Sequence, residues 1–316
     1  MIKNNVIKDE EKKYIAKQIK DISFDTVDKE MNQLIEIGVN THTKSSRCRT
    51  GNNIVDYFTF QQRLETRGKY NITFYEFVER FDEFREKKFI KTMLAYYTNV
   101  KNKNNKKNNY VVLKEVYNIC ISAINIIRPL VYMEIYNKYK TTCVLDFCAG
   151  WGGAAVACAA LNIPKYIGIE INTNLKEPYD KLIQYLNTKS TSDIKMIFDD
   201  ALNVDYSVMY YDFVFTSPPY YFIQQYENNV KYTNKQHMNE EFYKPIFTKV
   251  YNGLQLNGYF AINVCKEVYD SVLYPLLGKA HDFYPYKKSH RQNRYNEIVY
   301  VWKKMNVHAL VLENTP

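Results

Sequence analysis

The sequence predicts an α/β protein with a doubly wound, mainly parallel sheet and a mostly helical N-terminal region. From residue 141 onward, short apolar runs of strand length alternate with helical stretches, a pattern typical of βαβ units. Before residue 110, apolar residues recur at helical spacing instead. The handedness of βαβ connections then favours an open sheet whose ligands bind at the carboxyl ends of the strands.

The N-terminal part reads as several amphipathic helices. Residues 1–40 carry apolar side chains near helical spacing, and the stretch 73–97 places phenylalanines at 74, 77, 81, 84 and 89. The run KNKNNKKNN at 101–109 has no apolar residue and predicts a solvated loop. We therefore expect a basic, largely helical region over 1–110 and an α/β domain over 111–316.

The α/β domain is expected to begin with a helix within 111–139. Strands are predicted at 142–148, 165–171, 194–200, 211–217, 258–264 and 297–304, and helices at 152–162, 175–187 and 240–254.

Charge is distributed unevenly along the chain. Of the net charge of +9, all lies in residues 1–140, which hold 26 Lys and Arg against 17 Asp and Glu. A localised basic excess suits a polyanionic partner such as nucleic acid. Candidate phosphate contacts in this region are Arg47, Arg49, Arg63, Arg67 and Lys69.

Composition also bears on the compartment. No run reaches the roughly 18 apolar residues of a membrane span, and the charged N-terminus lacks the apolar core of a signal peptide. The six cysteines show no CxxC spacing, which predicts reduced thiols, and the scattered histidines show no metal-ligand spacing. We expect an intracellular protein of the cytoplasm or nucleus, with no membrane partner. Its many Asn, Lys, Ile and Tyr residues suggest an AT-rich genome, such as that of a virus in its host cell.

A small-residue turn follows the first predicted strand. Asp146 ends that strand, and Gly150, Gly152 and Gly153 come within seven residues of it. Glycines allow a ligand to approach the backbone, and the next helix offers unpaired amides. Glu170, about 20 residues further on, suits a ribose hydroxyl pair. The turn formally fits the dinucleotide fingerprint as well, but an acid before the glycines favours a cationic ligand end.

A second motif ends the strand predicted at 211–217. There the chain continues as Ser217-Pro218-Pro219-Tyr220, and the two prolines remove two amide donors and fix two φ angles. The strand therefore ends in a stiff corner rich in acceptors. Tyr221, next along the chain, is either a core residue or a second wall of a pocket.

Together, DFCAGWGG at 146–153, GIEIN at 168–172, FDDAL at 198–202 and TSPPY at 216–220 resemble the motifs of class I S-adenosylmethionine (SAM)-dependent amino-methyltransferases, similar to DNA cytosine-N4 and adenine-N6 enzymes. The resemblance covers roughly residues 125–304 and implies a Rossmann-like sheet with an antiparallel last strand. It implies SAM as cofactor, bound by Asp146, Phe147, Ala149, Gly150, Gly152, Glu170, Ile171, Asp200 and Ala201.

In these roles Asp146 orients the amino-acid end of SAM, Glu170 binds the ribose, and Asp200 or the adjacent Asp199 binds the adenine amine. The catalytic residues implied are Ser217, Pro218, Pro219 and Tyr220. The Ser217 hydroxyl and the Pro218 carbonyl would accept the N–H bonds of the substrate amine, and Tyr220 would stack on a flipped base.

The substrate stays open at this point. Serine in the motif favours cytosine N4 over adenine N6 of DNA, and the segment 222–239, rich in Asn, Gln and Lys, is a candidate for base recognition. RNA and a protein glutamine are alternatives with the same chemistry. A catalytically inactive binding subunit is a third, and an NAD-dependent reductase a fourth that leaves SPPY unexplained.

Overall fold

The computed structural model of the 316-residue chain describes residues 7–41, 48–68, 70–104, 106–221, 231–285 and 298–306. Its centre is one seven-stranded sheet with the order β3-β2-β1-β4-β5-β7-β6. The strands are β1 (Cys143–Asp146), β2 (Lys165–Glu170), β3 (Asp193–Phe198), β4 (Phe213–Thr216), β5 (Tyr259–Val264), β6 (Asp282–Pro285) and β7 (Ile298–Lys303). The first five run parallel, and β7 pairs antiparallel with both β5 and β6. The predicted doubly wound sheet with an antiparallel last strand is confirmed.

The sheet has its topological switch point between β1 and β4. From β1 the chain moves outward to β2 and β3, then returns to pair β4 with the other side of β1. Leu145 of β1 is level with Val214 of β4, so both strands end near the same height. Ligands of open α/β sheets bind in the crevice outside the carboxyl ends at such a point. The two predicted motifs therefore end on neighbouring strands.

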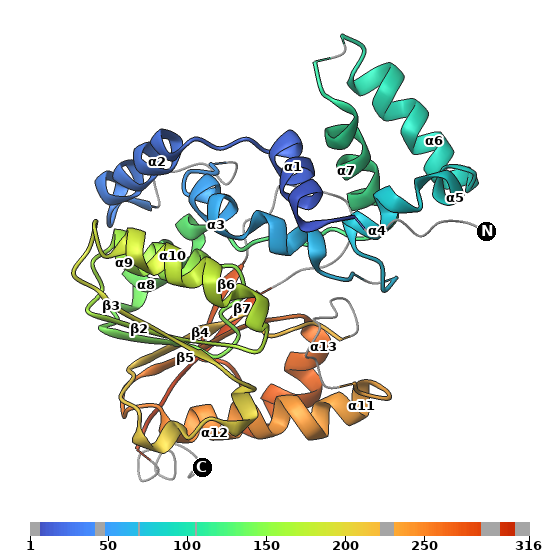
Figure 1. Ribbon diagram of the computed structural model, residues 1–316. Coiled ribbons are helices and arrows are strands. Elements are labelled where there is room, and N and C mark those ends of the chain that lie inside the picture. The colour runs from blue at the N-terminus through green and yellow to red at the C-terminus, as the bar shows by residue number, and fades with distance from the viewer. Residues whose placement is uncertain are drawn as a thin grey trace.

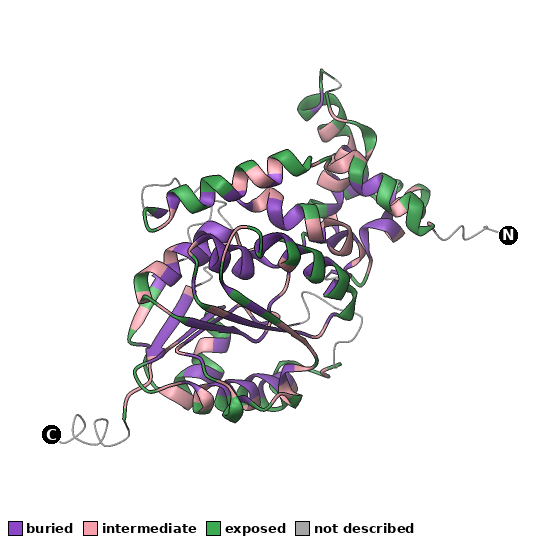
Figure 2. Cartoon of the chain, turned by 60° about the vertical axis from the view of Figure 1, so that its left-hand side comes forward, coloured by how far each residue is buried: buried purple, intermediate pink, exposed green. Residues whose placement is uncertain are grey.

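Helices cover both faces of the sheet (Figure 1). One face carries α8 (Pro129–Tyr139), α9 (Gly153–Ala160) and α10 (Lys176–Leu186), and α2 (Phe24–Ile37) and α3 (Asn52–Glu65) pack in the same hydrophobic core. The other face carries α11 (Lys235–Met238), α12 (Lys244–Gly253), α13 (Lys266–Val268) and α14 (Tyr274–Leu277). Figure 2 shows the buried residues concentrated between these layers.

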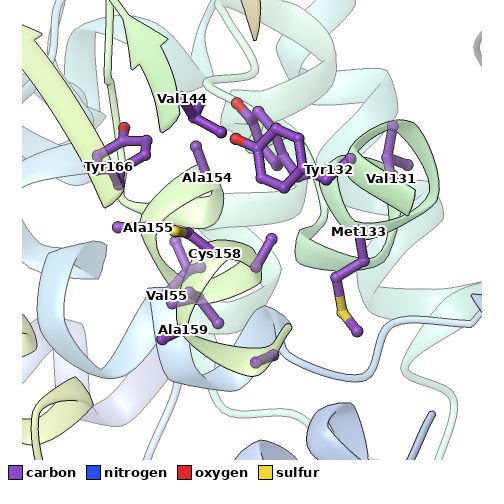
Figure 3. Packing of buried hydrophobic residues seen from close by; sticks show 14 of the residues in the cluster. Val55, Val131, Tyr132, Met133, Val144, Ala154, Ala155, Cys158, Ala159 and Tyr166 are labelled. Carbon is purple, nitrogen blue, oxygen red and sulfur yellow. The ribbon is translucent and has the colours of Figure 1, made fainter. Parts of the chain in front are cut away.

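The small side chains of α9 allow close packing at the centre of the molecule. Every residue of this helix is buried, and six of its eight are Gly or Ala. Figure 3 shows Ala154, Ala155 and Cys158 next to Val55 of α3 and Tyr132 of α8. Pro129 starts α8 with the φ angle a first helical turn requires. This packing holds the loop before α9 between the sheet and the N-terminal helices.

The remaining N-terminal helices form a separate helical lobe with its own core. It consists of α1 (Asp9–Ile19), α4 (Phe74–Glu79), α5 (Phe81–Arg85), α6 (Lys88–Tyr96), the π-helical segment η2 (Tyr97–Lys101) and α7 (Asn109–Cys120). Phe74, Phe77 and Phe84 are buried there, as their helical spacing predicted. A capping box between Thr73 and Glu76 starts α4.

Two expectations differ from the packing. The boundary expected at residue 110 falls inside α7, which packs with the helical lobe, whereas α2 and α3 share the core of the α/β domain. The loop expected over 101–109 begins one residue later, because η2 extends to Lys101. Within it the buried Asn102 side chain donates to the Lys107 carbonyl and accepts from the Lys107 amide. β6, a short edge strand ending in Pro285, was not predicted because it has little apolar pattern.

Candidate functional site

The site begins with Asp146 at the end of β1. Its side chain is completely buried, accepts a bond from the Cys148 amide at 3.2 Å, and contacts the Tyr166 hydroxyl at 3.4 Å. Burial raises the pKa of Asp146 to about 6, although the bonds from Cys148 and Tyr166 oppose the shift. β1 thus delivers a desolvated carboxyl group to the switch point.

The glycine loop between β1 and α9 is bound to the end of β2. Gly150 and Gly152 have φ of +56° and +92°, which side-chain-bearing residues rarely adopt. The Gly150 amide donates to Glu170 at 2.8 Å, and the Ala149 and Gly150 carbonyls share the single proton of the Tyr179 hydroxyl, which lies 3.1 Å from each. From α3, Thr59 reaches the Trp151 carbonyl at 3.4 Å. The loop is therefore fixed before any ligand arrives.

Glu170 is the second buried acid of the site. Its two oxygens accept the Gly150 and Asn172 amides, at 2.8 and 2.9 Å. Burial raises its pKa to about 7, and the negative charge of Asp146 adds to the shift against those hydrogen bonds. Among the described residues, neither Asp146 nor Glu170 has an ion-pair partner. Two buried carboxyl groups without a cation favour binding of a positively charged ligand.

The other expected cofactor residues are arranged around this pair. Asp200 follows β3 and caps the turn η4 (Ala201–Asn203) by accepting the Leu202 amide at 2.9 Å, while the exposed Asp199 accepts the Asn203 side chain. Ala201 is buried, and Ile171 follows Glu170 directly. The Phe147 side chain instead packs against Phe247 in the core under α12, so only its backbone is available to line the site.

The SPPY corner contains a closed circuit of hydrogen bonds. Asn263, in β5, donates from Nδ2 to the Ser217 hydroxyl at 3.2 Å, and Ser217 Oγ lies 3.3 Å from the Tyr220 hydroxyl. That hydroxyl donates its proton to the Asn263 carbonyl, also at 3.3 Å. Since a tyrosine hydroxyl has one proton, Ser217 must donate to Tyr220. One lone pair of Ser217 is then left to accept a substrate N–H.

The rest of the corner is anchored in the core. The Tyr243 hydroxyl of η6 (Asn239–Tyr243) donates to the Pro219 carbonyl. Tyr221 is buried, donates to Asn239 at 2.7 Å, and meets the Tyr243 ring edge-on at 5.5 Å. Of its two predicted roles, Tyr221 has that of a core residue. Pro218 is buried, whereas Ser217 and Tyr220 are partly exposed.

Asn263 was missing from the predicted site. It is 1% exposed, and its Oδ1 atom has no hydrogen-bond partner among the described residues. The pairing of Thr216 with Ile262 places the next residues, Ser217 and Asn263, side by side at the carboxyl ends of β4 and β5. A polar residue near the end of an apolar strand, FAINV, was the available signal.

The five predicted phosphate contacts differ in their surroundings. Arg47 and Lys69 lie outside the described residues, and Arg49 is exposed. Arg67 pairs through both guanidinium nitrogens with Glu76, at 2.7 and 2.6 Å. Arg63 is buried and pairs with Asp56, which also binds Lys20. Its prediction as a phosphate contact was wrong, because the guanidinium neutralises a buried acid. Half of the segment 222–239, residues 222–230, also lies outside the described part.

Sequence comparison assigns the α/β domain to a family. A family model described as RNA cap guanine-N2 methyltransferase matches residues 141–304, more than half of the chain. The chain belongs to this family. No curated protein sequence matches it. Membership confirms the predicted reaction type, methyl transfer from SAM, and with it the predicted cofactor and class I methyltransferase fold.

Solved structures with a similar fold are distant in sequence. TrmN from Thermus thermophilus is 16% identical, with a TM-score of 0.40, and the match covers 57% of this chain but only 49% of that one. SMU.1697c, a putative methyltransferase from Streptococcus mutans in complex with SAH, is 15% identical, with a TM-score of 0.40 over 57% and 99% of the two chains. An rRNA methylase from Streptococcus thermophilus is 15% identical, with a TM-score of 0.36 over 58% and 100%.

The described residues contain neither a helix able to span a bilayer nor a His, Cys, Asp and Glu cluster able to hold a metal ion. All six cysteines are described, and each is a free thiol.

Proposed function

We propose that the protein transfers a methyl group from SAM to the exocyclic N2 amine of guanine in RNA, with the guanine of a 5′ cap as the acceptor. The family match supports the guanine acceptor and the RNA. The observation that carries the proposal within the structure is the buried Oδ1 of Asn263, beside Ser217, which has no hydrogen-bond partner among the described residues. The acceptor expected from the sequence alone was instead cytosine N4 or adenine N6 of DNA.

The donor pattern of each base distinguishes these acceptors. In guanine the N2 amine lies between the N1–H donor and the N3 acceptor, so N1–H and one N2–H point in the same direction. In adenine and cytosine the reactive amine is flanked by a ring nitrogen that accepts hydrogen bonds. A site for those bases would therefore need a donor beside Ser217. Asn263 Nδ2 already donates to Ser217, and the atom left unpaired is the acceptor Oδ1. An unpaired acceptor suits the N1–H of guanine.

The charge and backbone conformation of the residues near Asp146 and Glu170 suit SAM. SAM supplies a methyl group on a positively charged sulfonium, together with the ammonium group of its zwitterionic amino-acid end. Asp146 and Glu170 provide buried negative charge with no competing cation among the described residues. The backbone of Gly150 and Gly152, in the left-handed region, permits close approach of the ligand to the loop. We assign the amino-acid end to Asp146, the ribose to Glu170 and the adenine amine to Asp200.

The residues of the SPPY corner hold the nucleophile. The lone pair of N2 is delocalised into the base, so the amine is a weak nucleophile until its hydrogens are held out of the ring plane. Ser217 Oγ and the Pro218 carbonyl accept those hydrogens and Tyr220 supports the base. The N–C bond forms as the C–S bond breaks, yielding N2-methylguanine and S-adenosylhomocysteine. The amine proton leaves to water after the transfer.

The test is to incubate the protein with SAM and with capped RNA, uncapped RNA and mixed-sequence DNA, and then to identify methylated nucleosides by mass spectrometry. We expect N2-methylguanosine from capped RNA. Ser217→Ala combined with Tyr220→Ala should abolish transfer while SAM still binds. N4-methylcytosine or N6-methyladenine as the product, or guanine methylation only in DNA, would overturn the proposal.

A further inference from the structure

The strongest charge asymmetry of the molecule lies in the helical lobe, outside the site described above. Residues 87–114 contain eight lysines and no acidic residue. Six of these lysines are exposed: Lys87, Lys88, Lys91, Lys101, Lys103 and Lys106. Within this segment the described ion pairs involve Lys107 alone, with Glu115 at 2.6 Å. The positive charge of α6, η2 and the turn after them is therefore almost uncompensated.

This lack of acidic partners differs from the lysines of the α/β domain. There, exposed lysines such as Lys181, Lys244 and Lys266 pair with an acid four residues away at 2.5–2.8 Å. Such pairs are the usual arrangement on a solvated helix. A lysine-rich helix without them repels itself and is stabilised by a polyanion.

Apolar side chains are exposed among these lysines. Ile90 buries one side of α6 in the lobe core, but Phe89 is 58% exposed, Tyr96 40% and Val100 60%. They are seven and four residues apart on the continuous helix formed by α6 and η2, so they follow one stripe along it. Lys101 lies 5.8 Å from the centre of the Tyr96 ring. Exposed rings interleaved with lysines suit stacked bases and phosphates.

The helical lobe is tied directly to the methyl-transfer site. In α3, Thr59 contacts the Trp151 carbonyl of the glycine loop, while Leu64 lies in the lobe core. Figure 1 shows α4–α7 on the same side of the molecule as α11 and α13, which follow the carboxyl ends of β4 and β5. One helix, α3, therefore contacts both the glycine loop and the lobe core.

We propose that the lysine-aromatic surface, defined as Lys87, Lys88, Phe89, Lys91, Tyr96, Lys101, Lys103 and Lys106, binds the single-stranded RNA that follows the methylated guanosine. The inference rests on the proposed function, because the RNA bound here is the same molecule whose guanine is methylated. The lysines contact phosphates and the two rings stack on bases. The RNA body thus adds affinity that an isolated cap nucleotide lacks.

The experiment uses the full chain carrying Lys87→Gln, Lys88→Gln and Lys91→Gln together. Its control carries Lys176→Gln, Lys181→Gln and Lys195→Gln, which remove the same charge from exposed positions of the α/β domain. Methyl transfer is measured on a cap dinucleotide and on a capped RNA of about 20 nucleotides, longer than a typical single-strand site. Binding of an uncapped RNA of equal length is followed by fluorescence anisotropy at several salt concentrations.

We expect the lobe variant to raise KM for the capped RNA about tenfold and to leave kcat/KM for the dinucleotide unchanged. The slope of log affinity against log salt for uncapped RNA should fall by about 2, at roughly 0.7 per lost phosphate contact. Phe89→Ser with Tyr96→Ser should weaken binding at an unchanged slope. The control variant should match the wild type.

Equal loss in both charge variants, or no loss on RNA in the lobe variant, would overturn the proposal. If the lobe variant shows no loss on RNA, the exposed rings would instead indicate a binding surface for a protein partner. Failure of the proposed function is distinguishable, because it removes activity on the dinucleotide while the anisotropy measurement still reports on the surface.

Discussion

Replacing Asn263 with alanine breaks the hydrogen-bond circuit of the SPPY corner without touching the motif itself. The variant removes the Nδ2 donor to Ser217 and leaves the Asn263 backbone carbonyl, which accepts from Tyr220. Ser217 is then free to direct its remaining lone pairs elsewhere. Tyr220→Phe opens the same circuit from the other side, because it removes the hydroxyl that receives the Ser217 proton and keeps the aromatic ring.

The magnitude follows from the number of bonds that fix Ser217. Each substitution removes one hydrogen bond to this hydroxyl, worth about 1 kcal/mol, which corresponds to roughly fivefold in kcat. If the two bonds act through one circuit, opening it once removes most of the effect. The double variant should then lose about fivefold to tenfold, whereas independent contributions multiply to about 25-fold.

The assay is single-turnover methyl transfer at saturating SAM and saturating capped RNA, with the four proteins of the double-mutant cycle compared at the same pH. Asn263→Ala also removes the Oδ1 contact proposed for guanine N1–H, and saturating RNA keeps that loss of affinity out of the rate. The free energy of unfolding serves as the control, and for Asn263→Ala it should change by less than about 1 kcal/mol. The lost bond to Ser217 is offset because the unsatisfied Oδ1 is removed with it. Losses of kcat that multiply in the double variant, or full activity of both single variants, would refute the circuit as the device that orients Ser217.

Four further predictions concern charge. SAM affinity measured by calorimetry should fall as pH drops from about 8 toward 5.5, because Glu170 and Asp146, with pKa values of about 7 and 6, become protonated. Over the same range the free energy of unfolding of the ligand-free protein should rise, because folding raises both pKa values and the folded state therefore binds more protons. Glu170→Gln should weaken SAM binding more than about tenfold and, by urea titration, lower the unfolding free energy by about 1–3 kcal/mol, because only one of the Gly150 and Asn172 amides keeps an acceptor oxygen. Arg63→Ala should lower that free energy by about 3 kcal/mol, since Asp56 loses its buried partner and retains Lys20 alone. The Lys114 ammonium lies over the rings of Phe74 and Tyr117, and burial lowers its pKa to about 7. The cost of burying the charged form is largest below that pKa, so Lys114→Met should raise Tm more at pH 6 than at pH 9.

The parts of the fold that were predictable are those with a local signal. Six strands were located from apolar runs bounded by turns, and the glycine loop and SPPY corner from residue types that the backbone requires there. β6 was missed because an edge strand of four residues needs little apolar pattern. Arg63 was misassigned because the sequence does not reveal that Asp56, seven residues earlier on the same helix, is buried with it.

Asn263 shows what sequence reasoning lacked at the site. It lies 46 residues after Ser217, and only the pairing of β4 with β5 brings the two together. In the proposed mechanism the serine of SPPY holds the acceptor amine, but a hydroxyl accepts an N–H from any base. Discrimination among guanine, adenine and cytosine depends on the atom beside that amine. In the proposed mechanism Asn263 of the neighbouring strand supplies that contact, which the local motif does not. The proposed acceptor is therefore encoded on two strands, and a motif read along one of them points to the reaction before it points to the base.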